Sequence, residues 1–228
     1  MSHNVFLVPS WFLGYDIIFQ VLFVLVTLLV AWSSFKIYNL TQQARPKIFG
    51  MGFLLISTGY LMQAILNSIF FFHIQHIAFS PRQASFVINS YMVAVYSYTY
   101  IVLLGLITLV YMSFNVKKIK IHFLISLLVM MVLISSQDKL LLFYLMSVII
   151  CLFITHHYLS NYIKNKKTTS LLVMLGFTAM LASYVLFVFS LDSEIFYFAG
   201  HAVKLGAYIL ILTNLIRVLR ADKKQKKK

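Results

Sequence analysis

The stretch IIFQVLFVLVTLLVAWSSF, residues 17–35, is followed directly by KIYNLTQQARPK, residues 36–47. The first stretch is an apolar run of the length that an α-helix needs to cross a bilayer, and the second is a short basic connection. Because hydrocarbon contains no water, a segment that crosses it must satisfy its own backbone hydrogen bonds, as a helix does. The pair therefore predicts a transmembrane helix followed by a loop that carries positive charge.

The same alternation of apolar runs and short connections continues along the chain and predicts an all-α membrane protein. The runs are continuous, whereas the strands of a membrane barrel are ~10 residues long and alternate in polarity. The seven predicted transmembrane helices cover about residues 17–35, 48–72, 87–112, 121–136, 140–158, 168–190 and 195–216. We expect residues 1–220 to form one bundle and residues 221–228 to be a basic, disordered cytoplasmic tail.

Positive charge is concentrated in every second gap between the predicted spans, and all but three of the 19 Lys and Arg lie there or after the last span. The exceptions are Arg82, Lys139 and Lys204. Because short cytoplasmic loops retain Lys and Arg, this pattern predicts an outer N-terminus and a cytoplasmic C-terminus. The basic segments are 36–47, 117–120, 164–167 and 217–228.

Composition excludes several classes of protein. The chain is 61% hydrophobic and 11% charged, which does not suit a soluble domain. Its net charge of +14 flanks the apolar runs, so the expected partner is the lipid bilayer of the cell membrane, crossed several times, and not nucleic acid. Cys151 is the single cysteine, and it excludes an intrachain disulfide or a cysteine zinc cluster.

Signatures of known catalytic sites are missing from the sequence. It contains no HExxH, GxSxG or P-loop motif, so we expect no catalytic residue and no enzymatic activity. His73 and His76 have a spacing that suits a metal on a helix, but two ligands make a weak site. We therefore expect neither a bound metal nor a cofactor.

Proline and glycine positions bear on how the helices pack. All three prolines lie outside the predicted spans, which disfavours the interrupted helices typical of many transporters. Small residues in the last two spans predict close contact between helices. These residues are Gly176, Ala179, Ser183, Gly200 and Gly206.

Lys204 is the basic residue that membrane topology does not explain. It lies about ten residues into the last predicted span, where a cation costs ~3 kcal/mol on insertion scales. His201, Tyr197 and Tyr208 share its helical face by their spacing of three or four residues. The pattern predicts an inward-facing polar strip, with a structural lysine and a ligand-binding lysine as the two interpretations.

Polar residues near the outer ends of other spans can meet this strip. Asp16 lies at the start of the first span, and Gln63 and Asn67 lie in the outer half of the second. We expect these residues to form an outer polar pocket with His201 and Lys204. Asp16 is the natural counter-charge for Lys204, but at ~1.5 Å per residue it lies about 10 Å nearer the membrane surface, which disfavours direct contact.

The segment 198–208, FAGHAVKLGAY, resembles the last helix of MASE-type membrane-associated sensor domains. In those domains a Gly-His pair followed by Lys and an aromatic residue precedes a cytoplasmic output domain, and Gly200, His201, Lys204 and Tyr208 match this pattern. The segment 35–41, FKIYNLT, with Gly52 and Phe53, also looks like small standalone archaeal seven-helix proteins of unassigned function. No output domain follows Arg220, so the resemblance implies signalling through a cytoplasmic or membrane partner.

Three functions follow from these features. The first is a non-enzymatic sensor or accessory bundle with a polar pocket in its outer half. The second is a small-solute transporter or channel, motivated by polar residues in several spans. The third is a retinal-type chromophore protein, which needs a lysine in the last helix, although the third span contains no carboxylate and the sixth contains neither Trp nor Pro.

Overall fold

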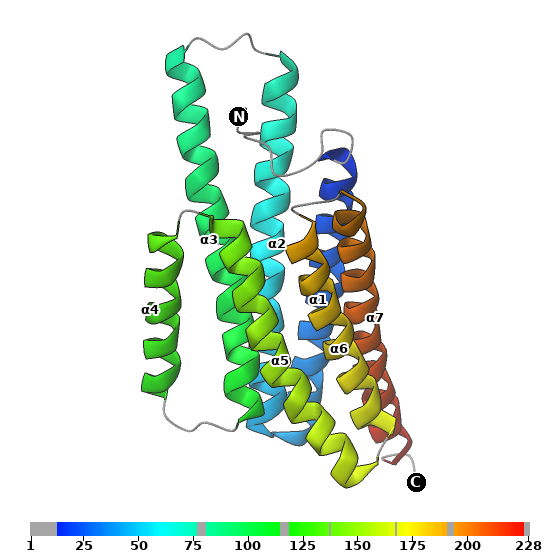
Figure 1. Cartoon of the computed structure of the whole chain (residues 1–228). Coiled ribbons are helices and arrows are strands. Elements are labelled where there is room, and N and C mark those ends of the chain that lie inside the picture. The colour runs from blue at the N-terminus through cyan, green and yellow to red at the C-terminus, as the bar shows by residue number, and fades with distance from the viewer. Residues whose placement is uncertain are drawn as a thin grey trace.

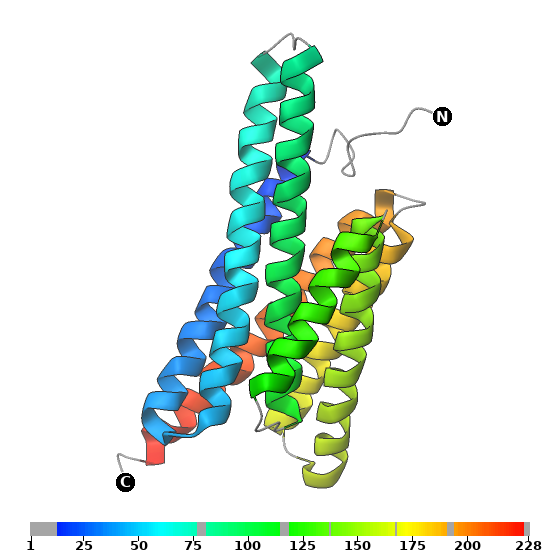
Figure 2. The same cartoon turned by 90° about the vertical axis from the view of Figure 1, so that its left-hand side faces the viewer.

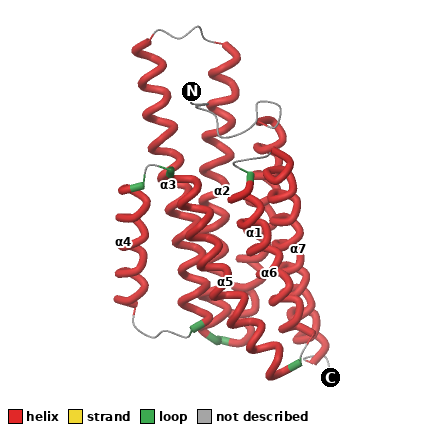
Figure 3. Tube along the Cα trace, in the orientation of Figure 1, coloured by secondary structure: helices red, strands yellow, loops and turns green. Residues whose placement is uncertain are grey.

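The computed structural model describes residues 13–76, 81–114, 119–136, 138–166, 168–190 and 194–225. Within these ranges the chain is entirely helical apart from short connections (Figure 3). The seven helices are α1 (Leu13–Thr41), α2 (Ala44–His76), α3 (Pro81–Ser113), α4 (Ile119–Ser135), α5 (Lys139–Asn165), α6 (Thr168–Phe189) and α7 (Glu194–Gln225). The predicted all-helical class is therefore confirmed for the described part of the chain.

Six of the helices form a closed ring. Contacts run from α1 to α2, α2 to α3, α3 to α5, α5 to α6, α6 to α7, and from α7 back to α1. Consecutive helices in the chain run in opposite directions, as Figures 1 and 2 show. The α2–α3 hairpin extends well beyond the other helices at one end of the bundle. Closure of the ring gives the protein a central interior that all six helices line.

Helix α4 lies outside this ring, against α3 and the start of α5 (Figure 1). Its buried side chains are Ser126, Val129 and Leu133, a narrow stripe with helical spacing, while most of its large apolar residues are exposed. With 17 residues, it is about 25 Å long at ~1.5 Å per residue, somewhat shorter than a ~30 Å hydrocarbon core. The other six helices are each long and apolar enough to cross a membrane.

The outer surfaces of the helices are apolar. On α1, for example, Ile18, Leu25 and Trp32 expose about half of their surface or more, yet they belong to one continuous helix. A soluble protein rarely exposes apolar patches of this extent, whereas lipid tails accept them. These surfaces and the six long helices indicate a polytopic membrane protein in contact with a lipid bilayer.

Apart from α6, the helices extend beyond the predicted spans, because hydropathy marks only the part of a helix that suits hydrocarbon. Helix α7 continues to Gln225 and so includes the first part of the predicted tail, residues 221–228. Ala, Lys and Gln are good helix formers, so a charged segment can prolong a helix into water. Residues 226–228 lie outside the described residues.

Local backbone features set the helix ends. Helix α1 ends where Gln42 adopts a left-handed conformation, with φ of 56°, and its N–H donates to the carbonyl of Tyr38 at 2.7 Å. Lys166 ends α5 in the same way, with φ of 47°. Pro46 and Pro81 lie inside helices, but in their first turns, where proline removes no intrahelical hydrogen bond.

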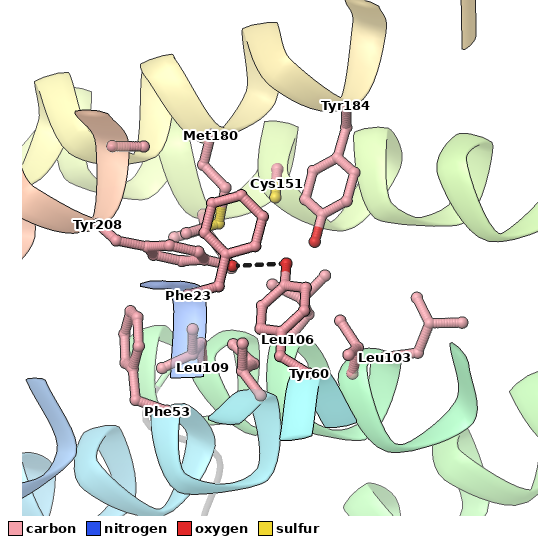
Figure 4. Packing of buried hydrophobic residues seen from close by; sticks show 14 of the residues in the cluster. Phe23, Phe53, Tyr60, Leu103, Leu106, Leu109, Cys151, Met180, Tyr184 and Tyr208 are labelled. Carbon is pink, nitrogen blue, oxygen red and sulfur yellow. Dashed lines mark hydrogen bonds between the residues drawn. The ribbon is translucent and has the colours of Figure 1, made fainter. Parts of the chain in front are cut away.

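Large aromatic and aliphatic side chains fill the interior of the ring (Figure 4). Phe23 of α1, Tyr60 of α2, Tyr184 of α6 and Tyr208 of α7 are almost completely buried there. Leu103, Leu106, Cys151 and Met180 complete the part of the core that Figure 4 shows, and α3 and α5 contribute the first three. This core lies directly beside the polar residues described next.

Candidate functional site

The carboxylate of Asp16 is the centre of a buried polar cluster between α1, α2 and α7. Its Oδ2 accepts hydrogen bonds from Gln20 Nε2 at 2.5 Å and from Asn67 Nδ2 at 2.8 Å. The hydroxyl of Tyr197 donates to Oδ1 at 3.2 Å, and His201 Nε2 lies 3.2 Å from the same oxygen. Both carboxylate oxygens therefore have polar partners although Asp16 exposes only 1% of its surface.

Helical spacing brings these groups to one level. Asp16 and Gln20 are one turn apart on α1, and Tyr197 and His201 are one turn apart on α7. Since α1 contacts both α7 and α2, the two pairs face each other and Asn67 reaches the carboxylate from α2. We call these five residues the Asp16 cluster.

Aromatic rings hold the imidazole of His201 in place. It stacks on Phe19 and Phe23 of α1, with ring centroids 5.4 Å and 5.7 Å away. Phe187 of α6 and Tyr197 meet it edge to face, with centroids at 4.9 Å and 4.6 Å. The orientation of the imidazole relative to the carboxylate is thereby fixed by packing, and the pair becomes ionic when the imidazole is protonated.

Lys204 lies one turn further along α7 and does not share the carboxylate. Its ammonium faces the rings of Phe187 at 4.2 Å, Tyr184 at 4.3 Å, Tyr60 at 5.8 Å and Phe23 at 5.9 Å. Among the described residues it makes no ion pair, and it exposes only 4% of its surface. The negative faces of aromatic rings attract a cation, so these four residues form an aromatic cage around the ammonium.

Tyr208 belongs to the next turn of α7 and contacts one residue of the cage. Its hydroxyl lies 2.9 Å from that of Tyr60, a hydrogen bond drawn in Figure 4. The hydroxyl of Tyr184 points towards the same pair in that view. Tyr60 thus belongs both to the cage and to the hydrogen bond that joins α2 to α7.

The structure brings together some of the residues predicted from sequence and separates others. Asp16, Asn67, Tyr197 and His201 lie in one cluster. Lys204 and Tyr208 lie beside that cluster with partners of their own. Gln63 is half-buried and makes no hydrogen bond among the described residues.

Sequence reasoning did not identify the aromatic cage. Phe23, Tyr60, Tyr184 and Phe187 come from three different helices, and the chain contains 21 Phe and 14 Tyr with no feature that marks these four. The only available signal was spacing, because Tyr184 and Phe187 share one face of α6. Gln20 was easier to predict from the sequence as a neighbour of Asp16, since it lies one turn after Asp16 on the same helix.

The chemistry open to this arrangement is proton exchange and ionic binding. A carboxylate and an imidazole whose polar atoms lie 3.2 Å apart can pass a proton between them, and the caged ammonium supplies positive charge nearby. Among the described residues, no group of three or more His, Cys, Asp or Glu side chains is arranged to hold a metal ion. The side chains of His73 and His76 lie outside that part.

Comparison with known proteins adds no relative: no family model matches the chain, and neither a curated protein nor a solved structure proved similar to it.

Proposed function

We propose that the protein is a non-enzymatic membrane sensor or accessory bundle in which the Asp16 cluster and the caged Lys204 form the responsive element. The observation that carries the proposal is the convergence of four side chains from α1, α2 and α7 on one buried carboxylate. Burying ionisable groups inside a membrane costs free energy, and apolar side chains would fill the same space without this desolvation penalty. A role in response to a signal accounts for their presence.

The path of α7 supports the same proposal. His201, Lys204 and Tyr208 lie on this helix, which continues without interruption to Gln225 at the opposite end of the bundle. A change of contacts around Asp16 or Lys204 would move a continuous rigid element. The resemblance of residues 198–208 to the last helix of MASE-type sensor domains agrees with an output carried by α7 to a partner protein.

The orientation in the membrane is part of the proposal. One end of the bundle, where α1, α3 and α5 finish, holds most of the described basic residues, and we call it the basic end. These residues include Lys36, Arg45, Lys47, Lys120, Lys164 and Arg217. We infer that the basic end is cytoplasmic and that α4 crosses the membrane as a seventh span. The Asp16 cluster then lies in the outer half of the bundle.

Thermal unfolding of the detergent-purified protein tests the sensor function. The probes are a panel of small amines, carboxylates and inorganic anions, each applied to wild type, Asp16→Asn and Lys204→Met. Asp138→Asn and Lys139→Met are matched controls, because they make the same chemical changes at the start of α5. We expect at least one compound to raise the Tm of wild type and of both controls, but not of the cluster variants.

If every compound changes the Tm of all five proteins equally, or changes none of them, the result contradicts a binding site at the cluster. The variants must first show cooperative unfolding without ligand, so that a lost shift reports binding and not loss of fold.

Transport is the second candidate function, favoured by the contact between the carboxylate of Asp16 and the imidazole of His201. Asp and His chains inside membranes are typical of proton relays in transporters. Proteoliposomes loaded with a pH-sensitive dye test this function. Proton uptake that requires Asp16, and that Asp138→Asn leaves intact, would favour transport over sensing.

A further inference from the structure

A cavity of about 210 Å³ lies at the basic end of the bundle, far from the Asp16 cluster. Every helix of the six-membered ring contributes at least one residue to its wall, while α4 contributes none. Arg45, Gln43 and Tyr158 bring polar groups, and Phe49, Met112 and Val173 are among the apolar residues. The cavity is smaller than the ~300–1,000 Å³ sites of drug-sized ligands, so it suits one end of a larger molecule.

Arg45 gives the cavity a positive charge without a counter-charge. It is exposed, no acidic residue lines the cavity, and the ion pair that the structure records among the described residues is the one between Asp16 and His201. Its guanidinium interacts electrostatically with His157 and Tyr158 of α5.

The local backbone reinforces this positive potential. Helix α2 begins at Ala44, so the N–H groups of its first turn, including that of Arg45, have no intrahelical acceptor. They lie at the positive end of the helix dipole. Lys36, Lys47, Lys164 and Arg217 lie in the helix segments at the same end of the bundle.

The rest of the lining suits an apolar body. Tyr158 stacks face to face on Phe177, with ring centroids 5.1 Å apart and planes 7° apart, and it lines the cavity. Phe49, Met112 and Val173 add further apolar surface. A ligand that matches both the charged and the apolar part of this lining has an anionic group attached to a hydrocarbon chain.

We propose that this cavity binds an anionic phospholipid of the membrane, with its phosphate at Arg45 and the start of an acyl chain or the glycerol backbone against Phe49 and Val173. Arg is suited to this role because its planar guanidinium donates two parallel hydrogen bonds to phosphate oxygens. The lipid would join the first turn of α2 to α5 and α6. This site is distinct from the responsive element proposed above and does not depend on it.

Binding is measured by the rise in Tm of the detergent-purified protein on titration with short-chain phosphatidylglycerol. Arg45→Gln removes the charge, and Lys47→Gln is its matched control, because Lys47 faces the ring of Tyr38 at 5.4 Å and does not line the cavity. We expect Arg45→Gln to weaken binding about tenfold, as befits a lost hydrogen bond between charged groups, and Lys47→Gln to leave it near wild type.

A second pair of variants tests the cavity itself. Val173→Phe fills it, whereas Leu175→Phe adds a ring two residues away on the exposed face of α6. We expect Val173→Phe to abolish the shift and Leu175→Phe to keep it. Equal losses in Arg45→Gln and Lys47→Gln would overturn the proposal in favour of general surface charge, and retention of the shift in Val173→Phe would overturn it as well.

Control ligands distinguish the source of the phosphate. Inorganic phosphate and glycerol 3-phosphate supply the anion without a chain, and short-chain phosphatidylcholine supplies the chain with a neutralised headgroup. We expect none of them to match phosphatidylglycerol. A full shift with a soluble phosphate would overturn the assignment to a lipid and identify a soluble anion as the ligand.

Discussion

At the scale of single residues, the buried side chains of Asp16 and Lys204 have different surroundings. Asp16 is surrounded by donors, with hydrogen bonds from Gln20, Asn67 and Tyr197. Lys204 is surrounded by aromatic rings. A carboxylate accepts directional hydrogen bonds, whereas an ammonium is stabilised by the negative faces of rings, so each charge has an environment that suits its chemistry.

Asp16→Ala is expected to destabilise the protein strongly, by about 3–5 kcal/mol, because it leaves several buried donors without an acceptor. Asp16→Asn retains one oxygen, and we expect a smaller loss of about 2 kcal/mol. Reversible unfolding by SDS in mixed micelles measures both values. Asp138→Asn, at an exposed position, should change the free energy by less than ~0.5 kcal/mol, and similar effects at both positions would show that the cluster contributes nothing to stability.

Lys204→Met is expected to act in the opposite direction. Desolvation of a lysine in a membrane costs ~3 kcal/mol, and attraction to aromatic rings offsets roughly 2 kcal/mol of this cost. A methionine of similar length fits the same cage and makes favourable sulfur–aromatic contacts. We therefore expect the free energy of unfolding to rise by about 1–3 kcal/mol in the same SDS assay.

The control for this prediction is Lys139→Met, whose ammonium lies 4.8 Å from the ring of Tyr96 at the start of α5. This change should be nearly neutral, because Lys139 is partly exposed and solvent screens its charge. A loss of stability in Lys204→Met would show that the ammonium anchors the helices instead of straining them. A gain would identify Lys204 as a residue retained at the expense of stability, as functional residues often are.

At the scale of helices, the closest approach of a glycine to the backbone of another helix is between α2 and α3. A Cβ on Gly105 would lie 2.7 Å from the carbonyl oxygen of Gly52 and 2.6 Å from Ile56 Cγ1. A Cβ on Gly52 would likewise meet the carbonyl of Gly105 at 3.1 Å. Small residues that let backbones approach are a common basis of helix association in membranes. The predicted glycines behave less uniformly: Gly176 and Gly200 pack against α7 and α6, but Gly206 faces open space.

Gly105→Ala is expected to destabilise the bundle by about 1–3 kcal/mol, because the new methyl group would press on the backbone of α2, which cannot yield as a flexible side chain can. Gly206→Ala is the matched control. No atom lies within 4 Å of its added Cβ, so relief of backbone entropy should stabilise α7 by ~0.5–1 kcal/mol. Opposite signs in SDS unfolding would confirm the α2–α3 contact, and two gains would contradict it.

At the scale of the whole molecule, the ring of six helices and the peripheral α4 raise the question of topology. If α4 crosses the membrane, the connections before and after it lie on opposite sides. Phe114 precedes α4 and Ser136 follows it, and both belong to the described residues. The charge pattern predicts that Phe114 lies on the cytoplasmic side and Ser136 on the outer side.

Single cysteines at these two positions, in a Cys151→Ala background, test both orientation and the seventh span. In intact cells a membrane-impermeant maleimide should label Ser136→Cys, whereas Phe114→Cys should require permeabilisation. Gln43→Cys, in the connection between α1 and α2, is predicted to lie on the cytoplasmic side and should behave like Phe114→Cys. Labelling of Phe114→Cys and Ser136→Cys from the same side would show that α4 does not cross.

Much of the architecture followed from sequence because the bilayer imposes a one-dimensional constraint. A run of ~20 apolar residues must become a helix, whatever its neighbours are. The polar face of α7 could also be derived, since Tyr197, His201, Lys204 and Tyr208 follow helical spacing. The last turns of α7 could not be derived from the sequence, because hydropathy does not detect a charged helix that continues into water.

What tertiary structure decided is the choice of partners. The sequence predicted Asp16 at the membrane edge and Lys204 within the last span, but only the closure of the ring placed α1 between α2 and α7, so that His201, not Lys204, reaches the carboxylate. The aromatic rings around Lys204 belong to α1, α2 and α6, and residues of six helices line the cavity near Arg45. Helical spacing fixes which residues share a face, whereas the rotation and neighbours of each helix depend on side-chain packing across the whole bundle.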